Sequence, residues 1–276
     1  MSRSLPGPPQ GAQSIERAVK VLRAVASSGS LGTKSVEIIA LTGLTKGTVH
    51  RILLALIREG LVEQADDTRL YFLGPEAYVL GTIASPRYGV DRWALPALRR
   101  LADVSQDTAF FSILRGFDVV TLQREEGDYP IKTHVLKPGD RHPLGVSSAG
   151  QAILAAMDDQ SVTRILKANA EVIRQRYPRY SIVTIEQIVK DARKNGFALN
   201  PGLVWPGSWG IGIAVRDPEG KPIGALNISA IESRLGAEVQ KELAVHLRRE
   251  AKWLSDQLRE LHSPQSTRAR INSTRP

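Results

Sequence analysis

Basic, hydroxyl and imidazole side chains gather in one short stretch, "TGLTKGTVHRILLALIREGLV", which begins at Thr42. Apolar residues from Val49 to Leu56 recur at the spacing of one buried helix face, and the polar residues fall on the other faces. No carboxylate lies between Glu37 and Glu59. A solvated helix can be basic by chance, but an acid-free face of cations and hydroxyls also suits a polyanion. We therefore expect this helix to contact the phosphates and base edges of nucleic acid.

The segments on either side complete a helix-turn-helix pattern. Ser14 can cap a first helix, and Ser35 can cap a short second helix. Gly43 then supplies a tight turn, and Thr45 can cap the basic helix that follows. Two short apolar runs around "ADDTR" predict a β-hairpin after this third helix. Three helices and a hairpin predict a winged helix-turn-helix domain over residues 14–74.

A winged domain places the second helix of its motif in the major groove, where base edges present a readable pattern of donors and acceptors. Arg51 can bind guanine with two hydrogen bonds, and Lys46 can contact the same edge as a point charge. The helix starts at Thr45 and Ser35 can each hold a phosphate, and Arg69 lies at the hairpin tip, where a wing contacts DNA. The predicted DNA-binding residues are Lys34, Ser35, Thr45, Lys46, Thr48, His50, Arg51 and Arg69.

Composition sets broad limits on the protein. The 276 residues suffice for two domains, and 42% hydrophobic with 24% charged residues is the balance of a globular protein with a core. The formal net charge of +9 favours an anionic partner. No apolar run reaches the roughly 18 residues of a membrane span, and the first residues lack the apolar stretch of a secretory signal. Cysteine is absent, which excludes disulfides and thiolate chemistry and fits a cytoplasmic protein.

The remainder of the chain predicts a linker and a second domain. Residues 1–13 are rich in proline and glycine and are expected to form a disordered arm. Residues 75–90 are expected to form a linker helix that ends before Pro86. Helix and strand patterns then mix over residues 91–262, which gives the α+β fold class. Residues 263–276, basic and without acid, are expected to form a disordered tail.

Individual elements of the second domain can also be predicted. We expect strands at "TAFFSIL", "DVVTLQRE" and "YPIKTHVL", and a final hairpin around "DPEG". Leucines from Leu243 to Leu261 predict a long amphipathic helix, which either packs on the sheet or forms a dimer interface. The acidic run "EEGD" at Glu125 can be a metal site or a solvated turn, and its place between two predicted strands favours the turn.

Motifs of catalysis and of metal binding are missing from the sequence. The five histidines are scattered without a His-Glu-x-x-His run, and there is no phosphate-binding glycine loop or nucleophile elbow. We therefore expect no enzymatic activity, no metal and no cofactor. A cofactor-free enzyme or a ligand-binding protein with an accessory DNA-binding domain stays open as the alternative. A non-specific architectural DNA protein is a third possibility.

Six stretches in series resemble the IclR (isocitrate lyase regulator) family of bacterial transcription regulators. They are "SIERAVKVLRAV", "TGLTKGTVHRILLALIREGLVE", "YFLGPEAYVLG", "TAFFSILRGFDVVTLQ", "GDRHPLGVSSAGQAILA" and "GIAVRDPEGKPIGALNIS". The resemblance implies a winged DNA-binding domain, a linker helix and an α/β effector-binding domain similar to GAF and PAS folds. It also implies a homodimer or dimer of dimers that binds double-stranded DNA and responds to small organic acids or aromatic compounds.

The same resemblance implies an effector pocket that is lined by the loop after "HPLGVSSAG" and by the last two strands. The residues that it assigns to the pocket are Ile131, His134, Ser148, Ala149, Asn200, Gly210, Asn227 and Ser229. The glyoxylate and pyruvate binder of the family has an acidic residue at the position of Asn200, a cysteine at that of Gly210 and a serine at that of Asn227. The class of effector can therefore differ in this chain.

Two features of the residues themselves bear on the effector. Ser148, Asn227 and Ser229, with the N–H groups of the helix that starts at "SAGQA", can form a modest anion cradle, although serines before a helix can also be simple caps. Trp205 and Trp209 can favour a ring-bearing effector or can simply cap the sheet. These patterns predict a carboxylate or an aromatic compound as effector.

Overall fold

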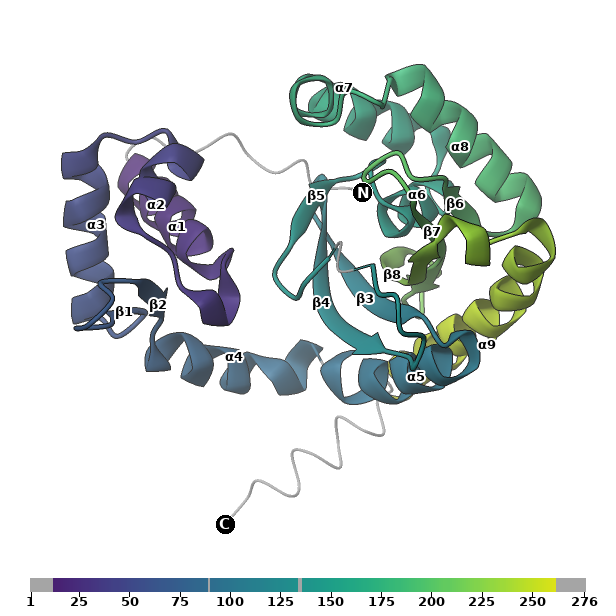
Figure 1. Ribbon diagram of the computed structural model, residues 1–276, viewed down its shortest axis with the longest axis horizontal. Helices are drawn as coiled ribbons and strands as arrows, with labels where there is room; N and C mark the ends of the chain where they lie inside the picture. Colours follow the sequence, from purple (N-terminus) through teal and green to yellow (C-terminus); the bar gives the residue numbers. More distant parts are fainter. Residues whose placement is uncertain (1–11, 89, 134–135, 262–276) are drawn as a thin grey trace, which may run out of the picture. The chain divides into compact units, whose positions relative to one another are not determined.

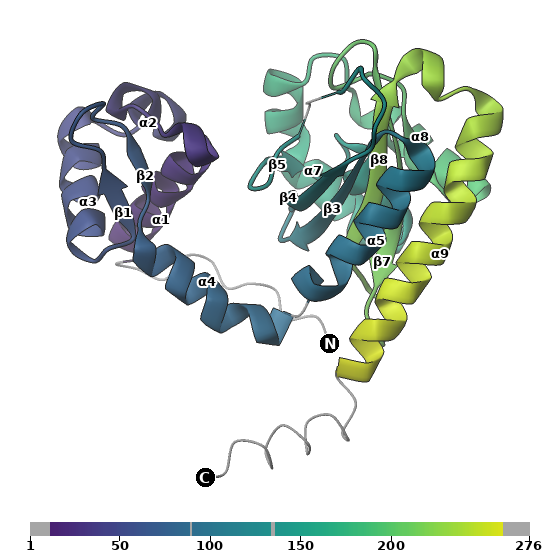
Figure 2. The same cartoon turned by 60° about the horizontal axis from the view of Figure 1, so that its bottom comes forward.

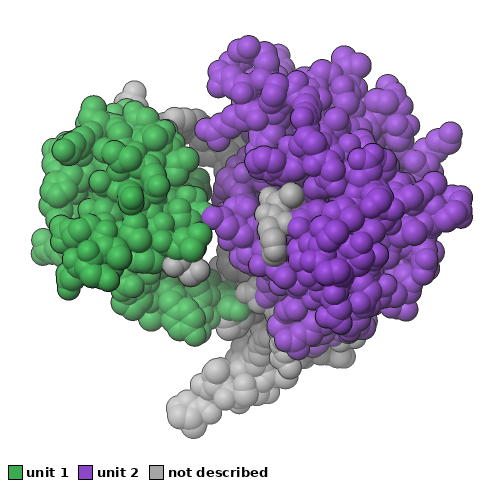
Figure 3. All heavy atoms as spheres, viewed as in Figure 1, with its two compact units in different colours: residues 1–87 green, residues 88–276 purple. Residues whose placement is uncertain are grey.

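The computed structural model describes residues 12–88, 90–133 and 136–261 (Figures 1 and 2). The predicted effector residue His134, most of the predicted N-terminal arm and the predicted C-terminal tail lie outside these residues. The chain divides into two compact units, residues 1–87 and residues 88–276 (Figure 3). Each unit is described by itself below.

The first unit is a three-helix assembly followed by a β-hairpin, as the sequence predicts. Its elements are α1 (Gln13–Ala26), the 3-10 turn η1 (Gly29–Leu31), α2 (Ser35–Thr42), α3 (Lys46–Arg58), β1 (Val62–Gln64), β2 (Tyr71–Leu73) and α4 (Pro75–Tyr88). Val21, Ile38 and Leu53 come from the three packed helices and are fully buried together. The strands pair antiparallel, with Glu63 opposite Phe72, and form the wing.

Local chemistry explains the end of α2 and the start of α3. Gly43 ends α2 in the left-handed conformation at φ 65°, which a residue without Cβ adopts at little cost. Thr45 caps α3 as predicted, because its side chain accepts a hydrogen bond from the Thr48 N–H at 3.3 Å. Ser14 and Ser35, however, are not caps: α1 begins one residue before Ser14, and α2 begins at Ser35 itself. Serine is also tolerated in a first turn, so the pattern alone could not fix the boundary.

The linker helix α4 runs through Pro86 to Tyr88, so the prediction that it ends before the proline was wrong. A proline inside a helix removes one backbone hydrogen bond and crowds the carbonyl four residues earlier. Near the end of a helix few further turns depend on that bond. The next helix, α5 (Val90–Ser105), likewise contains Pro96.

The second unit is built on one antiparallel sheet of six strands. They are β3 (Thr108–Arg115), β4 (Asp118–Glu126), β5 (Arg141–Pro143), β6 (Ala198–Asn200), β7 (Ser208–Arg216) and β8 (Pro222–Ile231), in the order β5-β4-β3-β8-β7-β6. The helices are α5, α6 (Ser148–Ala155), α7 (Asp159–Arg176), α8 (Ile182–Asn195) and α9 (Ala237–Leu261), and a 3-10 turn η2 (Glu232–Arg234) precedes α9. This mixture of helices and sheet confirms the predicted α+β class.

The helices cover both faces of the sheet. On one face α5 and α9 lie side by side (Figure 2), and Leu98 and Leu247 pack with Ile228 in one core. On the other face α6 packs directly on the sheet and α8 packs on α6, with Ile153 and Ile185 in a second core. The last helix therefore buries its leucines against the sheet of its own chain.

Strand β8 pairs with β3 on one side and with β7 on the other. Asn227 lies opposite Phe110 and Gly212, and Ser229 lies two residues further along. Because successive side chains of a strand point to opposite faces, Asn227 and Ser229 share the face that α6 covers. The residue between them, Ile228, points into the core under α5 and α9.

The prediction of a third strand at "YPIKTHVL" was wrong. The described part of residues 129–136 contains no strand, and the strand beside β4 is instead the short β5. Ile131 is 55% exposed, and the neighbouring Lys132 Nζ donates to the Gly127 carbonyl within the same loop. The described part of this segment thus alternates apolar and polar residues without pairing with a strand of the sheet. The edge strand β6 was not predicted.

Candidate DNA-binding and effector-binding sites

Helix α3 is held by an apolar face and presents a polar one. Val49 and Leu53 are buried, whereas Lys46, His50 and Arg51 are exposed. The exposed face carries no acidic side chain, because no carboxylate occurs within α3. The arrangement leaves a rigid helix whose outer surface can enter a groove of duplex DNA.

The starts of α2 and α3 offer backbone donors near this face. The first N–H groups of any α-helix lack intrahelical acceptors, and in α3 the Thr45 side chain satisfies only that of Thr48. The Lys34 N–H donates to Glu37 Oε2 at 2.9 Å, which fixes the start of α2 beside Ser35. Both helix starts are exposed and suit phosphate oxygens.

Arg69 lies in the wing at the turn between β1 and β2 and is exposed. It adopts a left-handed conformation at φ 58°, which is uncommon for a residue with a side chain. Gln64 Nε2 donates to the Arg69 carbonyl at 2.9 Å and supports this turn. Asp66 and Asp67 are exposed in the same turn, so the wing tip is less basic than Arg69 alone suggests.

Sequence reasoning missed Arg17. A groove between α1 and α3 is lined by Ser14 and Arg17 on one side and by Thr48 and Arg51 on the other. Arg17 is exposed, so a second guanidinium flanks the predicted DNA-contacting face. In the sequence it is one basic residue on an amphipathic helix, and only the packing of α1 against α3 reveals its place.

In the second unit, polar side chains surround a small cavity of about 30 Å³ beside the start of α6. A volume of this order accommodates one or two water molecules, so a larger ligand requires movement of the walls. The lining residues are Leu136, His142, Ser147, Ser148, Asn200, Val204, Trp205, Ser208, Trp209, Gly210, Asn227 and Ser229.

Asn227 forms the most unusual part of this lining. Its side chain is 1% exposed, and neither Nδ2 nor Oδ1 has a hydrogen-bond partner among the described residues. A buried amide without partners costs roughly 1–3 kcal/mol for each unsatisfied group. Such a group in a cavity wall points to a ligand or water that offers both an acceptor and a donor.

Two glycines let α6 approach the sheet. A Cβ at Gly212 would lie 2.8 Å from the Ser148 carbonyl oxygen, and one at Gly210 would lie 2.8 Å from the Ser148 hydroxyl oxygen. Ser147 caps the helix by accepting from the Gly150 N–H at 3.2 Å. The start of α6 is thereby held directly over β7 and beside Asn227.

Asn200 lines the cavity but is engaged by the protein. Its Nδ2 donates to the Val146 carbonyl at 2.7 Å and contacts the Tyr180 hydroxyl, and its Oδ1 accepts from the Leu203 N–H at 3.0 Å. The Tyr180 hydroxyl also donates to the Val146 carbonyl, and burial raises the pKa of Tyr180 well above its usual value. Asn200 thus fixes the loop that follows β6.

His142, on β5, is a cavity residue that sequence reasoning missed. Its Nδ1 lies 2.9 Å from the hydroxyl of Tyr177, at the end of α7. Burial lowers the pKa of His142, and Asp140 and Asp118 oppose this shift through their charges. The signal for it was its place in "HPLGVSSAG", the stretch from which the pocket was predicted.

The predicted effector residues separate into three groups. The cavity brings together Ser148, Asn200, Gly210, Asn227 and Ser229. Ala149 is buried in α6 beside this lining without being part of it, and Ile131 lies in an exposed loop. Trp205 is 56% exposed at the cavity, whereas Trp209 also packs on the core under α5 and α9.

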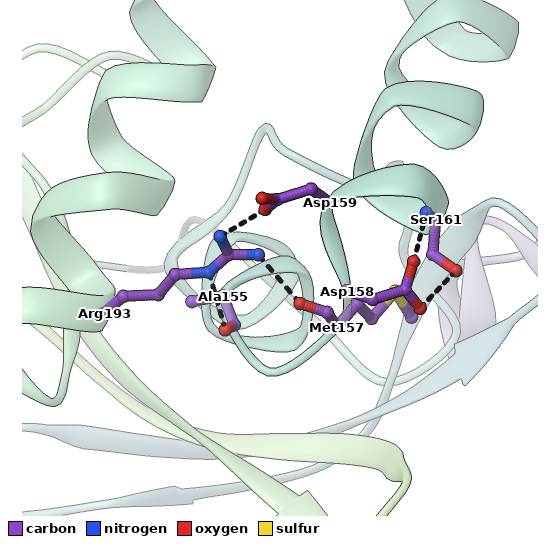
Figure 4. Close-up of polar contacts among 6 residues, drawn as sticks. All are labelled: Ala155, Met157, Asp158, Asp159, Ser161 and Arg193. Atoms are coloured by element: carbon purple, nitrogen blue, oxygen red, sulfur yellow. Dashed lines mark hydrogen bonds and ion pairs between the residues drawn. The ribbon is translucent and has the colours of Figure 1, made fainter.

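The other end of α6 is clamped by Arg193 of α8 (Figure 4). Arg193 Nε donates to the Ala155 carbonyl at 3.2 Å, and Nη2 donates to the Met157 carbonyl at 2.7 Å. Nη1 forms an ion pair with Asp159 at the start of α7. Asp158 caps α7, and its hydrogen bonds from the N–H and hydroxyl of Ser161 lower the pKa of its carboxyl. One guanidinium therefore joins α6, α7 and α8.

Within the described ranges, no three His, Asp or Glu side chains gather in a group that can hold a metal ion. No single helix there is long and apolar enough to cross a membrane. Only α2 and α3 pass that test of length and composition together, and they are bent by 113°.

A winged helix-turn-helix unit joined to an α/β unit with a polar cavity defines a two-domain DNA-binding regulator with a ligand-binding domain. Two family models match the chain: the IclR helix-turn-helix domain at residues 14–66, and the C-terminal domain of the bacterial transcriptional regulator IclR at residues 84–256. The chain belongs to the IclR family of bacterial transcriptional regulators.

Named relatives agree with this assignment. The chain is 29% identical to the HTH-type transcriptional regulator BhcR of Paracoccus denitrificans over 82% of this chain and 80% of that one. It is 29% identical to the glycerol operon regulatory protein of Streptomyces coelicolor over 89% of this chain and 96% of that one. An IclR homologue of Microbacterium hydrocarbonoxydans, solved with 4-hydroxybenzoate, shares its fold with a TM-score of 0.70 at 21% identity, covering 89% and 98% of the two chains.

These findings decide between the alternatives that the sequence left open. The relatives are named regulators, and the family models cover both the DNA-binding and the effector-binding parts. The protein is therefore a DNA-binding transcriptional regulator with an effector-binding domain and not an enzyme.

Proposed function

We propose that this regulator recognises a specific operator through α3 and that a small carboxylate or aromatic effector, bound in the cavity beside α6, changes operator affinity. The observation that carries the DNA part is the exposed, acid-free face of α3, fixed by buried Val49 and Leu53. We assign DNA binding to residues 14–74, linkage to residues 75–90 and effector binding to residues 91–262.

Contacts to DNA divide by position on this unit. Arg51, His50 and Lys46 are exposed on α3 and suit base edges, and Thr48 is half-buried beside them. The remaining predicted residues, Lys34, Ser35, Thr45 and Arg69, suit phosphates together with Arg17.

Substitution of Arg51 tests the DNA assignment. Arg51→Ala is expected to weaken operator binding by about 1–3 kcal/mol, because a bidentate base contact is lost. Arg51→Lys keeps the charge and is expected to lose discrimination between sequences with little change in salt dependence. Arg99→Ala, at a position on α5 that is 64% exposed, removes one positive charge outside the proposed site as a control.

The measurement is a fluorescence anisotropy titration of operator DNA and of random duplex at several salt concentrations. Operator fragments come first from selection of genomic fragments by the purified protein. Equal operator affinity of Arg51→Ala and the parent contradicts the assignment.

The effector part rests on Asn227, whose buried amide has no partner among the described residues, in a wall that also carries Ser148 and Ser229. That a homologue of this fold was solved with 4-hydroxybenzoate supports an acidic or aromatic ligand. An effector shifts operator affinity only if it binds the two states of the regulator with different affinities. We place the coupling in the linker helix α4, between the two functional units.

Asn227→Leu tests this part. The variant is expected to bind operator like the parent and to lose the effector response, since leucine cannot supply either hydrogen bond. Asn195→Leu, at an exposed position of α8, is the matched control. Operator release is measured with candidate organic acids, and an unchanged response of Asn227→Leu removes that residue from the pocket.

We further propose a homodimer or dimer of dimers, because two copies of α3 on adjacent half-sites give useful affinity and palindromic recognition. Light scattering with and without operator measures the assembly. Control of catabolic or transport genes is proposed from the operon regulators among the relatives, and a cytoplasmic location follows from the proposed access to chromosomal DNA.

A further inference from the structure

Among the described residues that line the cavity beside α6, one side chain can carry a positive charge. The described lining contains serines, asparagines, apolar residues and tryptophans, together with His142, but no lysine or arginine. Of the described side chains, the neutral donors and His142 are therefore those that can stabilise an anionic ligand inside the cavity. Burying a carboxylate without a compensating charge is costly, so the protonation state of His142 matters for such a ligand.

The neutral part of the cavity is rich in donors. Asn227 Nδ2 has no partner among the described residues, and the Ser147 hydroxyl accepts from the Gly150 N–H, which leaves its own hydrogen to donate. The first N–H groups of α6 also lack intrahelical acceptors and add the positive end of the helix dipole. Several donors around one small space suit the two oxygens of a carboxylate.

The geometry of His142 prepares it for proton uptake. Its Nδ1 is paired with the Tyr177 hydroxyl at 2.9 Å, and Nε2 makes no hydrogen bond within the described ranges. Neutral His142 can accept from Tyr177 at Nδ1 and carry its proton on Nε2. When Nδ1 is protonated, the same hydroxyl can rotate and accept instead. Tyr177 therefore positions the ring in both states.

The charged groups around His142 come from several elements. Asp118 lies on β4 and pairs with Arg141 at 3.1 Å, Asp140 precedes β5, and Arg176 acts on Tyr177 at the end of α7. Burial lowers the pKa of His142 by more than the two carboxylates raise it, so the imidazole is neutral at a lower pH than it would be in water. A carboxylate placed inside the cavity adds a negative charge that favours the protonated ring.

We propose that a carboxylate effector binds in this cavity together with one proton, which His142 takes up, so that effector binding weakens as the pH rises. This inference rests on the proposed effector function and adds a charge requirement to it. Without ligand, the pKa of His142 lies below its usual value near 6.5, and bound carboxylate raises it. Ligand affinity therefore depends on pH between the pKa of the free protein and the pKa of the complex. Within that window, affinity for a carboxylate falls by up to tenfold per pH unit.

Acetate and acetamide make a direct test on the full-length protein without DNA. The two probes match in shape and number of non-hydrogen atoms, but only acetate is anionic. The His142 imidazole signals are assigned by comparison with His142→Gln and followed by NMR through a pH titration. Sodium chloride at matched ionic strength is the control for salt.

We expect a saturable shift of the His142 signals with acetate, a rise of the His142 pKa by one unit or more, and no such rise with acetamide. His142→Gln should bind acetate at least tenfold more weakly at pH 6 and lose most of the pH dependence. Absence of saturation with acetate in the parent overturns the proposal, as does equal acetate binding by parent and His142→Gln. Because no DNA is present, failure here leaves the operator assignment intact, and failure of operator binding leaves this result intact.

Discussion

The close approach of α6 to the sheet makes Gly212→Ala a sharp test of the effector domain. An added Cβ would lie 2.8 Å from the Ser148 carbonyl oxygen and 3.0 Å from its carbonyl carbon, both backbone atoms of the first turn of α6. It would also lie 3.3 Å from the Asn227 Cβ. Backbone atoms cannot rotate away, so the helix start must move from β7.

The expected cost follows from overpacking. Inserting a methyl group into a close-packed interior destabilises a domain by about 1–3 kcal/mol. For a domain of this size, that corresponds to a fall in melting temperature of about 2–4 °C for each kcal/mol. Gly210→Ala is the matched control, because its Cβ would meet mainly the Ser148 hydroxyl, which can rotate. We expect the Gly210 variant to lose clearly less stability.

Tryptophan fluorescence can follow the unfolding of the effector-binding domain. All four tryptophans, Trp93, Trp205, Trp209 and Trp253, lie in the second unit, so thermal and urea unfolding followed at this signal is selective for it. If Gly212→Ala matches the parent within about 0.5 kcal/mol, the packing argument is wrong. Greater loss in Gly210→Ala than in Gly212→Ala contradicts it equally.

Two further predictions concern the corner between α6 and α7, in addition to those for Arg51 and Asn227. Arg193→Lys keeps the charge but loses the two guanidinium hydrogen bonds to the Ala155 and Met157 carbonyls. We expect it to lower the free energy of unfolding by about 1–2 kcal/mol in the same urea assay. An unchanged urea midpoint contradicts this role of Arg193. Asp158→Asn keeps a capping oxygen without the charge. Hydrogen bonds from Ser161 lower the Asp158 pKa, so its contribution is present above about pH 4 and is lost as the pH falls through the lowered value. The variant should therefore lose less stability than the parent between about pH 5 and pH 3, and parallel curves count against this.

The turn and the third helix of the DNA-binding unit were predictable because they have local chemical markers, whereas the starts of α1 and α2 were not. Gly43 and Thr45 mark the turn and the cap, and the spacing of Val49 and Leu53 identifies the buried face. The linker was harder to predict. Pro86 is a reliable breaker in the middle of a helix, but near a helix end it removes one bond that the last turns scarcely need.

The cavity was only partly predictable. The period of two along "ALNIS" places Asn227 and Ser229 on one face, but which face α6 covers depends on the whole sheet. The His142 ring is held by a hydrogen bond with Tyr177, which lies 35 residues away at the irregular end of α7. The position of Arg17 beside Thr48 and Arg51 likewise results from the packing of α1 against α3. Such relations are tertiary, and no local pattern encodes them.

Strand β8 is paired along both edges, so Asn227 and Ser229 are fixed in the interior of the sheet. The cavity lining also includes Trp205, which is more than half exposed and belongs to the segment after β6. Under the proposed effector function, a ligand must match the polar atoms of Asn227 and Ser229, and these two side chains need little ordering when it binds. The exposed Trp205 side chain then leaves more room for differences in ligand size.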